Sequence, residues 1–431
     1  MKCNYSCKSA EHSMARRGFL GGMLGAAGSA SSVVGGLGIF ANPAIAKELT
    51  SQQKRVVVFN MASGLSQLES WDPKPGQDTG GPFRAIPTSV PGVHISELLP
   101  ITAKQMHHLA LVRSINTKEN DHGKGRYMMF TGRRQTPAQE FPQIGAVMAK
   151  GLGADKNALP GYIQVSSSTG GRSNDSAYLG PAFASIRIAS GKPPANSARP
   201  GTLDENRDML RNNFRKLAND DFSLRRRSAQ TDAYTQSYEQ AQQLMAKRDV
   251  FDITKEPQKD HERYGDHQLG QHTLLARRLL ENGVTMVQVT HSNYDTHNEN
   301  FNFHFEQLGE FDRAFGTFVQ DIADRGMLES TLIVVLSEFG RTPRINQRYG
   351  RDHWGSSWSI CLGGAGIQRG AVIGATGEDG VQIKDREVDH GHLFHTYLQA
   401  VGVDSLGHFS IGGQDIPVAD PAYAPIEELL I

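Results

Sequence analysis

The chain has 431 residues, with 45 lysines and arginines against 45 aspartates and glutamates, so its formal net charge at pH 7 is zero. A balanced charge gives no reason to expect a nucleic acid or an anionic membrane surface as a partner. The length is sufficient for one large α/β domain or for two smaller domains.

The first 46 residues predict an export signal. They contain four basic residues and one acidic residue, followed by a weakly apolar stretch rich in glycine and alanine. The core RRGFL, from Arg16 to Leu20, matches the twin-arginine pattern, and Ala44 and Ala46 form a small-x-small cleavage site. The alternative is a membrane anchor, but an anchor needs about 20 strongly apolar residues. We therefore expect residues 1–46 to be a twin-arginine signal peptide that directs a folded protein to the periplasm or outside the cell.

The expected mature chain, residues 47–431, retains one cysteine, Cys361, because Cys3 and Cys7 lie in the signal. It therefore cannot form an intramolecular disulfide, although the destination is oxidising. No later apolar run approaches 18 residues, so we expect no membrane span after signal cleavage. The sequence leaves the oligomeric state open.

The order of helices and strands predicts the fold class. In the second half of the chain, two helices that end at glycine stop signals are each followed directly by a buried strand. This alternation is typical of a doubly wound α/β fold, so we expect one domain over 47–431 with a mostly parallel sheet and helices on both faces. The expected elements are strands at 56–60, 109–115 and 162–166, a polar helical insertion at 202–250, helix 267–281, strand 284–290, helix 303–325, strands 331–337 and 357–364, and helix 392–401.

The loops that follow the predicted strands are rich in metal-ligand residues. Ligands of doubly wound sheets bind at the carboxyl ends of the strands. Carboxylates mixed with imidazoles suit zinc, manganese or iron, whereas calcium prefers oxygen ligands alone. Each residue taken singly could instead be an ordinary surface or capping residue. We expect a divalent metal, with zinc, manganese, iron or calcium as the options, held by Asp295, His297, Glu338, Asp352 and His353.

Basic side chains lie in the same loops. Lys124 and Arg126 follow the second strand, and Arg341 follows the strand at 331–337. We expect these three residues to bind the anionic group of a substrate. The alternative for Arg126, Arg341 and Arg351 is that they pair with the nearby acids and hold the loops. His122 lies in the same loop as Lys124 and Arg126 and is a further residue of a metal-ligand type.

Several blocks of this sequence closely resemble a known family. SEFGRTPRIN, GRDHW and GGAGIQRGAVIGAT are similar to the bacterial family called domain of unknown function fifteen-oh-one, and SQLESWDPKP and YDTHNENF are similar as well. The blocks span roughly residues 56–378. That family is placed in the alkaline phosphatase-like superfamily, alongside sulfatases, and is commonly exported with twin-arginine signals. The resemblance implies an alkaline phosphatase-like domain with a metal centre at the strand ends.

The superfamily's site residues carry over only in part. Sulfatases have a C-x-P-S-R segment that runs into Thr-Gly, and HGKGRYMMFTG has the same spacing, with Arg126 on that arginine. The nucleophile position falls on His122 rather than on Ser, Thr or Cys. The metal-binding segment is similar to Asp295 and His297, the later Asp-His pair falls on Glu338 and Phe339, and the late histidine is similar to His353. The usual acid directly after the first strand is absent, and Glu69 or Asp72 would have to reach back to replace it.

These departures leave three alternatives for the chemistry. The imidazole of His122 is itself the nucleophile, or a water activated by the metal attacks while His122 acts as a ligand or as a general acid/base. In the third alternative, the fold is kept and the chemistry is lost. Our hypothesis is an exported metal-dependent hydrolase of phosphate or sulfate esters, including carbohydrate esters. Its expected catalytic residues are His122, which would assist the chemistry, and Lys124 and Arg126, which would bind the anionic group. The alternative is a non-catalytic exported binding or assembly protein.

Overall fold

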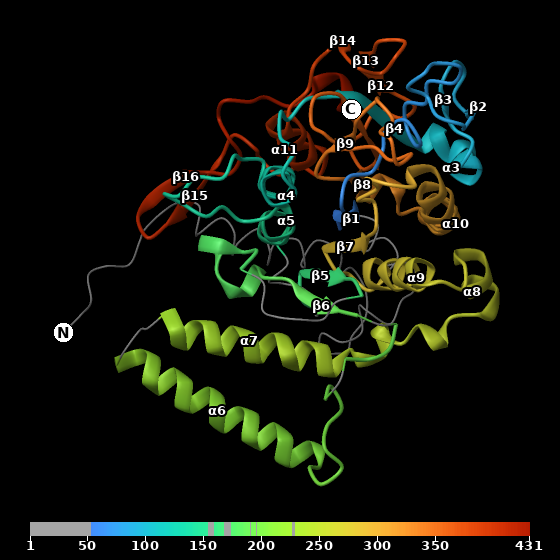
Figure 1. The fold of residues 1–431 in the computed structure, drawn as a ribbon. Coiled ribbons are helices and arrows are strands. Elements are labelled where there is room, and N and C mark those ends of the chain that lie inside the picture. Colours follow the sequence, from blue (N-terminus) through green and yellow to red (C-terminus); the bar gives the residue numbers. More distant parts are fainter. Residues whose placement is uncertain (1–52, 154–158, 168–173, 190, 195, 226–228) are drawn as a thin grey trace, which may run out of the picture. The chain divides into compact units, whose positions relative to one another are not determined.

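A computed structural model describes residues 53–153, 159–167, 174–189, 191–194, 196–225 and 229–431. The expected signal peptide lies outside these residues. Residues Thr50–Ile431 form one compact unit. Its centre is an eight-stranded sheet with the strand order β12-β4-β11-β8-β1-β7-β5-β6 (Figure 1). The strands of this sheet are β1 (Arg55–Met61), β4 (Leu109–Ile115), β5 (Tyr162–Val165), β6 (Ile186–Ile188), β7 (Met286–His291), β8 (Thr331–Leu336), β11 (Trp358–Gly364) and β12 (Val372–Ile373).

Seven of these strands run in one direction and β11 runs in the other. β1 pairs in parallel with β7 and β8, β5 pairs in parallel with β6 and β7, and β4 with β12. β11 lies antiparallel between β4 and β8, which fixes β4 parallel to β8. The carboxyl ends of β1, β4, β7 and β8 consequently lie at the same edge of the sheet. The predicted mostly parallel sheet is confirmed.

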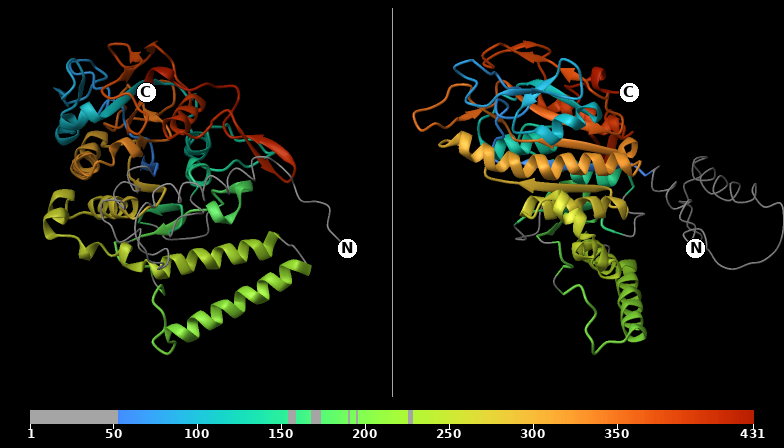
Figure 2. Two further views of the ribbon diagram at one scale, coloured as in Figure 1. Left: turned by 180° about the vertical axis from the view of Figure 1, so that it is seen from behind. Right: turned by 90° about the vertical axis from the view of Figure 1, so that its right-hand side faces the viewer.

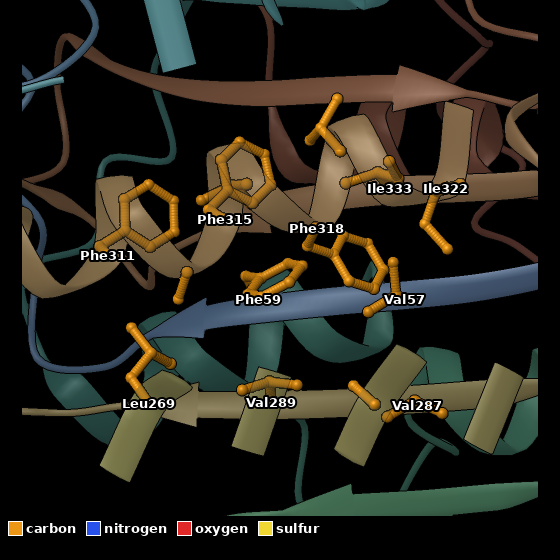
Figure 3. Packing of buried hydrophobic residues seen from close by; sticks show 14 of the residues in the cluster. Val57, Phe59, Leu269, Val287, Val289, Phe311, Phe315, Phe318, Ile322 and Ile333 are labelled. Atoms are coloured by element: carbon orange, nitrogen blue, oxygen red, sulfur yellow. The ribbon is translucent and has the colours of Figure 1, made fainter. Parts of the chain in front are cut away.

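Helices cover both faces of the sheet, as the doubly wound prediction requires (Figure 1). One hydrophobic cluster joins the sheet to α9 and α10, and the other joins it to α4, α5 and α11. In the first cluster, the ring of Phe59 on β1 lies edge-on to Phe315 and Phe318, with centroids 5.1 and 5.4 Å apart (Figure 3). The helices are α3 (Pro100–Gln105), α4 (His122–Thr131), α5 (Ile144–Gly151), α6 (Glu205–Arg225), α7 (Ala229–Ala246), α8 (Gln258–Tyr264), α9 (Gln268–Glu281), α10 (Asn300–Asp324) and α11 (His390–Ala400).

Within the described residues, four two-stranded antiparallel ribbons lie in the loops outside the main sheet. They are β2 with β3 (Ala85–Pro87 and His94–Ser96), β9 with β10 (Gly340–Arg341 and His353–Trp354), β13 with β14 (Ala375–Thr376 and Ile383–Asp385), and β15 with β16 (His408–Ile411 and Gln414–Pro417). The ribbon of β9 and β10 pairs Arg341 with His353, so it brings two parts of one long loop together beside the sheet.

Helix α4 was not indicated by the sequence. Two glycines in its first turn, Gly123 and Gly125, lower the helix propensity of the segment. The structure gives a reason for Gly125, because a Cβ atom there would lie 2.9 Å from the carbonyl oxygen of Glu338. The close approach of α4 to the end of β8 therefore outweighs the local preference against a helix.

Helices α6 and α7 occupy the segment that was expected to be a helical insertion. They form a hairpin at the outer edge of the described chain, with α7 between α6 and the sheet (Figures 1 and 2). Within the described residues, no helix combines the length and the apolar character needed to cross a membrane.

Candidate metal centre

Loops from four strands meet at the carboxyl edge of the sheet. Ser63 follows β1, His122 follows β4, Asp295 follows β7 and Glu338 follows β8. β11 is antiparallel and begins at this same edge, which places His353, five residues before it, beside the other loops. Because a doubly wound sheet gathers the ends of its parallel strands, these distant segments of the chain form one cluster of side chains.

His122 is held by the first turn of α4 and by Glu338. Asp121 caps the helix by accepting a hydrogen bond from the backbone nitrogen of Lys124 at 2.9 Å. Nδ1 of His122 lies 2.8 Å from Oε1 of Glu338, and its Nε2 lies 3.5 Å from Oδ1 of Asp295. Glu338 also accepts a hydrogen bond from the backbone nitrogen of Ser63 at 2.9 Å. The imidazole therefore bridges two carboxylates from different strand-end loops.

His297 and His353 also approach the carboxylate of Asp295, His297 from the loop after β7 and His353 from the loop before β11. Nδ1 of His297 lies 2.7 Å from Oδ1 of Asp352, and Nδ1 of His353 lies 2.7 Å from the carbonyl oxygen of Asn120. The Nε2 atoms of the two rings are 2.9 Å apart, and each lies 3.1 Å from Oδ1 of Asp295. Three imidazoles thus turn their Nε2 atoms toward one oxygen of Asp295.

The partners of the three Nδ1 atoms determine which nitrogen carries the proton. A carbonyl oxygen can only accept, so Nδ1 of His353 donates to Asn120 and carries the hydrogen. The carboxylates of Glu338 and Asp352 act in the same way on His122 and His297. In the neutral rings each Nε2 therefore has a free lone pair. Two lone pairs that face each other at 2.9 Å, as in His297 and His353, require a cation or a proton between them.

Arg341 is the other residue that contacts Asp295. Its side chain is fully buried, and it donates from one terminal nitrogen to Oδ1 of Asp295 at 2.7 Å. The same guanidinium donates to the carbonyl oxygens of Ser63, Gly64 and Arg351. The expectation that Arg341 binds the anion of a substrate does not fit this placement, because its donors are used inside the protein and it is not exposed to solvent.

The electrostatics favour an ionised Asp295 and neutral His353. Burial opposes the ionisation of Asp295, but the hydrogen bond and the positive charge of Arg341 outweigh it and lower the pKa of Asp295 to about 2. Burial is the largest cause that lowers the pKa of His353, and the charges of Arg341 and His122 act in the same direction. The hydrogen bond to Glu338 raises the pKa of His122. A proton on His353 is therefore disfavoured at the point where two Nε2 atoms meet.

The donor set suits a transition metal better than calcium. His122, Asp295 and His353 each offer one ligand atom, and the three atoms lie within 4.8 Å of one another. His297 adds a third imidazole through its contacts with Asp295 and His353. Imidazoles with one carboxylate fit zinc, manganese or iron, whereas calcium takes oxygen ligands. Each of the three imidazoles has an oxygen acceptor on Nδ1, the arrangement that normally orients metal-binding histidines.

The other predicted site residues lie around the cluster in different ways. Asp352 and Glu338 turn their oxygens to the Nδ1 atoms of His297 and His122, on the side of each ring away from Asp295. Lys124 is exposed on the first turn of α4. Arg126 is also exposed, and its guanidinium lies over the ring of Phe130 at 5.8 Å from the centroid.

Glu69 and Asp72, which could have replaced the missing acid after the first strand, are engaged elsewhere. Glu69 forms a fully buried ion pair with Arg351 at 2.8 Å, and Asp72 accepts hydrogen bonds from Lys74 and Thr376. Sequence reasoning missed Asn120 and Ser63, which contribute backbone groups. No side-chain pattern signals such a role, and only their positions next to His122 and after β1 could have drawn attention to them.

The sequence matches the family described as "Protein of unknown function (DUF1501)" over residues 53–430. The chain belongs to this family. The resemblance noted in the sequence blocks is therefore confirmed, and the match extends over nearly all of the described residues of this DUF1501 protein. A search of curated proteins found no match to the chain.

The DUF1501 chain is similar to many solved structures, including the following three. The sulfatase PsFucS1 from Pseudoalteromonas sp. is 14% identical, with 83% of this chain and 70% of that chain covered and a TM-score of 0.41. A protein in the alkaline phosphatase superfamily from Vibrio parahaemolyticus is 12% identical (81% and 67% covered, TM-score 0.37). The periplasmic domain of EptC from Escherichia coli, in complex with Zn, is 9% identical (86% and 87% covered, TM-score 0.39). These likenesses are distant, and no activity follows from them.

Proposed function

We propose that this chain is an exported metal-dependent hydrolase of phosphate or sulfate esters. The observation that carries the proposal is the meeting of the Nε2 atoms of His122, His297 and His353 at Oδ1 of Asp295. Two imidazole lone pairs at 2.9 Å repel each other unless a metal cation or a proton lies between them, and a metal cation would also meet the third imidazole at the same oxygen. A divalent metal such as zinc, manganese or iron satisfies this arrangement of donors.

In this proposal His122, Asp295, His297 and His353 hold the metal, and Glu338 and Asp352 orient the imidazoles. A bound divalent cation supplies Lewis acidity toward an oxygen of an anionic ester. Both nitrogens of His122 are engaged, Nδ1 with Glu338 and Nε2 toward Asp295, so His122 is not free to act as a nucleophile. Of the alternatives that the sequence leaves open, this favours attack on the ester by water.

We assign substrate binding to the exposed cations in the first two turns of α4. Lys124 lies two residues after His122 and Arg126 lies one helical turn after it, so both belong to the helix end that carries the cluster. With Arg341 buried, these two residues are the proposed partners of the ester's phosphate or sulfate group. The half-exposed side chains of Asp295 (46%) and His122 (38%) leave the cluster open to a ligand from solvent.

Export is part of the same proposal. The twin-arginine segment at Arg16 and Arg17 would carry the protein out of the cytoplasm in a folded form, and this route allows a metal to be loaded before export. A variant with both arginines replaced by lysine should accumulate as unprocessed precursor in the cytoplasm. Cell fractionation followed by mass measurement of the chain tests this, and a normally exported and processed variant would contradict it.

The decisive test is the metal content of the protein, measured by elemental analysis after purification without chelators or affinity metals. We expect about one equivalent or more of zinc, manganese or iron. Asp295→Ala and His353→Ala should reduce it to background, whereas His408→Ala, on the exposed β15–β16 ribbon, should leave it unchanged. A wild-type protein that takes up no metal even after soaking would overturn the proposal.

Turnover separates the hydrolase from the non-catalytic alternative. The metal-loaded protein should hydrolyse 4-nitrophenyl phosphate or 4-nitrophenyl sulfate, and this activity should disappear in Asp295→Ala together with the metal. A protein that binds metal through these residues and hydrolyses neither ester would support the alternative of an exported binding or assembly protein.

A further inference from the structure

Helix α6 turns its apolar side away from the rest of the protein. Leu210, Phe214, Leu217 and Leu224 have exposed fractions of 65%, 75%, 68% and 85%. At 100° per residue these four side chains fall within about 80° of the helix circumference and form one strip. Two further exposed apolar side chains of α6, Met209 and Phe222, lie about 100° and 120° from the middle of this strip. Soluble proteins rarely leave such a contiguous strip of large apolar side chains in water unless it binds something.

The opposite side of α6 is polar and faces α7. Asn219 donates to the hydroxyl of Thr235 at 3.1 Å, and Asn212 accepts from the hydroxyl of Tyr238 at 3.0 Å. The guanidinium of Arg215 stacks over the ring of Tyr238 at 3.9 Å. An amphipathic helix normally buries its apolar side against its own protein. In this hairpin, α6 instead packs its polar side on α7, and its apolar strip faces outward because α6 is the outer helix (Figures 1 and 2).

The spacing of the strip matches the seam of a coiled coil. Leu210, Leu217 and Leu224 repeat every seven residues, and Phe214 lies four residues after the first of them. These are the d and a positions of a heptad pattern, and the remaining a positions are Arg207 and Asp221. Apolar side chains at these heptad positions fit the seam formed with another helix. Asp221 also interrupts the strip, which opposes insertion into lipid.

We propose that α6 pairs with α6 of a second copy of this chain in antiparallel orientation. A two-fold interface requires a surface that complements itself, and this strip does so in one orientation. With antiparallel helices, Phe214 lies opposite the partner's Leu217. Arg207, which pairs with Asp204 of its own helix at 3.3 Å, then lies within one turn of the partner's Asp221 and bridges the two acids. With parallel helices, Asp221 lies beside the partner's Asp221 and Arg207 beside the partner's Arg207, and the like charges repel.

Sedimentation equilibrium of the purified chain between about 1 and 100 µM, a range that covers weak interfaces, tests the pairing. We expect the mass to rise toward that of a dimer. Leu217→Ser should raise the dissociation constant on the order of tenfold or more, because it removes a central apolar layer. Met209→Ser is the matched control, since Met209 is equally apolar, 55% exposed and on the same helix but outside the strip. It should leave the dissociation constant unchanged.

A charge exchange tests the orientation. Asp221→Arg should weaken the dimer, and Arg207→Glu combined with Asp221→Arg should restore it, since the two charges then meet again across the two-fold axis. Arg207→Glu also removes the ion pair of Arg207 with Asp204, so far-UV circular dichroism of each variant checks that the helix is kept. A monomer at every concentration, or a dimer that Leu217→Ser leaves intact, would overturn the proposal. A monomer that sediments with vesicles of anionic lipid would show a membrane surface to be the partner instead.

Discussion

In the proposed metal site, Glu338 supports a ligand without being a ligand itself. Its carboxylate accepts a hydrogen bond from Nδ1 of His122 at 2.8 Å and another from the backbone of Ser63. The first bond fixes the tautomer that leaves Nε2 of His122 as a ligand, and the second fixes the carboxylate itself. Mutation of a residue that hydrogen-bonds to a metal-binding histidine typically changes metal affinity by 10- to 100-fold.

Replacing Glu338 with glutamine tests this assignment at the scale of one atom pair. We expect Glu338→Gln to lower metal affinity by roughly 10- to 100-fold without unfolding the protein, because the imidazole loses a charged acceptor. Competition against a chelator measures the affinity. Glu310→Gln is the matched control, since Glu310 also lies beside a histidine, 3.5 Å from Nε2 of His291, but outside the cluster. Equal affinities in the two variants would mean that Glu338 does not support His122.

The sequence predicted the residue types of the site better than their roles. His122, Asp295, His297 and His353 lie at the strand ends where the alternation of helices and strands placed them. Their orientation depends on contacts between distant segments, such as Nδ1 of His353 with the carbonyl oxygen of Asn120, 233 residues away. The burial of Arg341 likewise depends on the carbonyls of the loop after β1. Such contacts leave no periodic pattern in the sequence. The sequence alone therefore cannot distinguish a metal-binding residue from a residue that orients it.

At the scale of whole elements, the long amphipathic helices and apolar strands were predictable and α4 was not. Helices α9 and α10 have a clear apolar face and a glycine stop. β1 and β8 each contain a continuous apolar run, and β4 is mostly apolar. Helix α4 is short and carries two glycines in its first turn. It exists because it packs closely on the residues after β8, and this contact is also what brings His122 to Glu338.

Two helical glycines give opposite predictions. A Cβ atom at Gly125 on α4 would lie 2.9 Å from the carbonyl oxygen of Glu338, whereas one at Gly309 on α10 would meet nothing within 4 Å. Alanine favours a helix over glycine by about 1 kcal/mol. Gly309→Ala should therefore raise the melting temperature. Gly125→Ala should lower it and should also weaken metal binding, because α4 must move away from Glu338.

Thermal unfolding of both variants measures the change in melting temperature, and a metal titration measures the change in metal affinity. The pair is informative because helix propensity alone predicts stabilisation in both. If Gly125→Ala raised the melting temperature as Gly309→Ala does, the close packing of α4 on the end of β8 would not be what positions His122.

At the scale of the whole molecule, the three helices α8, α9 and α10 are tied together by one buried carboxylate. Asp321 on α10 accepts hydrogen bonds from Arg277 on α9 at 2.7 Å and from Tyr264 on α8 at 3.0 Å, and it also pairs with Arg263. Asp321 and Arg277 are almost completely buried. Burial opposes the ionisation of Asp321, but the bonds from Arg263 and Arg277 outweigh it and lower its pKa.

This arrangement predicts a pH-dependent contribution to stability. Because the folded state lowers the pKa of Asp321, its contribution is fully present above the unfolded-state value of about 4 and is lost as the pH falls through the folded-state pKa. Asp321→Asn leaves the buried guanidinium of Arg277 without this carboxylate, which should lower the free energy of unfolding at pH 7 on the order of 3 kcal/mol. Urea unfolding of both proteins should show this difference at pH 7 and a progressively smaller one below pH 4. Asp249→Asn, which removes an exposed partner of Lys255, should change little at either pH. A difference for Asp321→Asn that stays the same across the acid range would mean that the ion pairs of Asp321 are not what joins these helices.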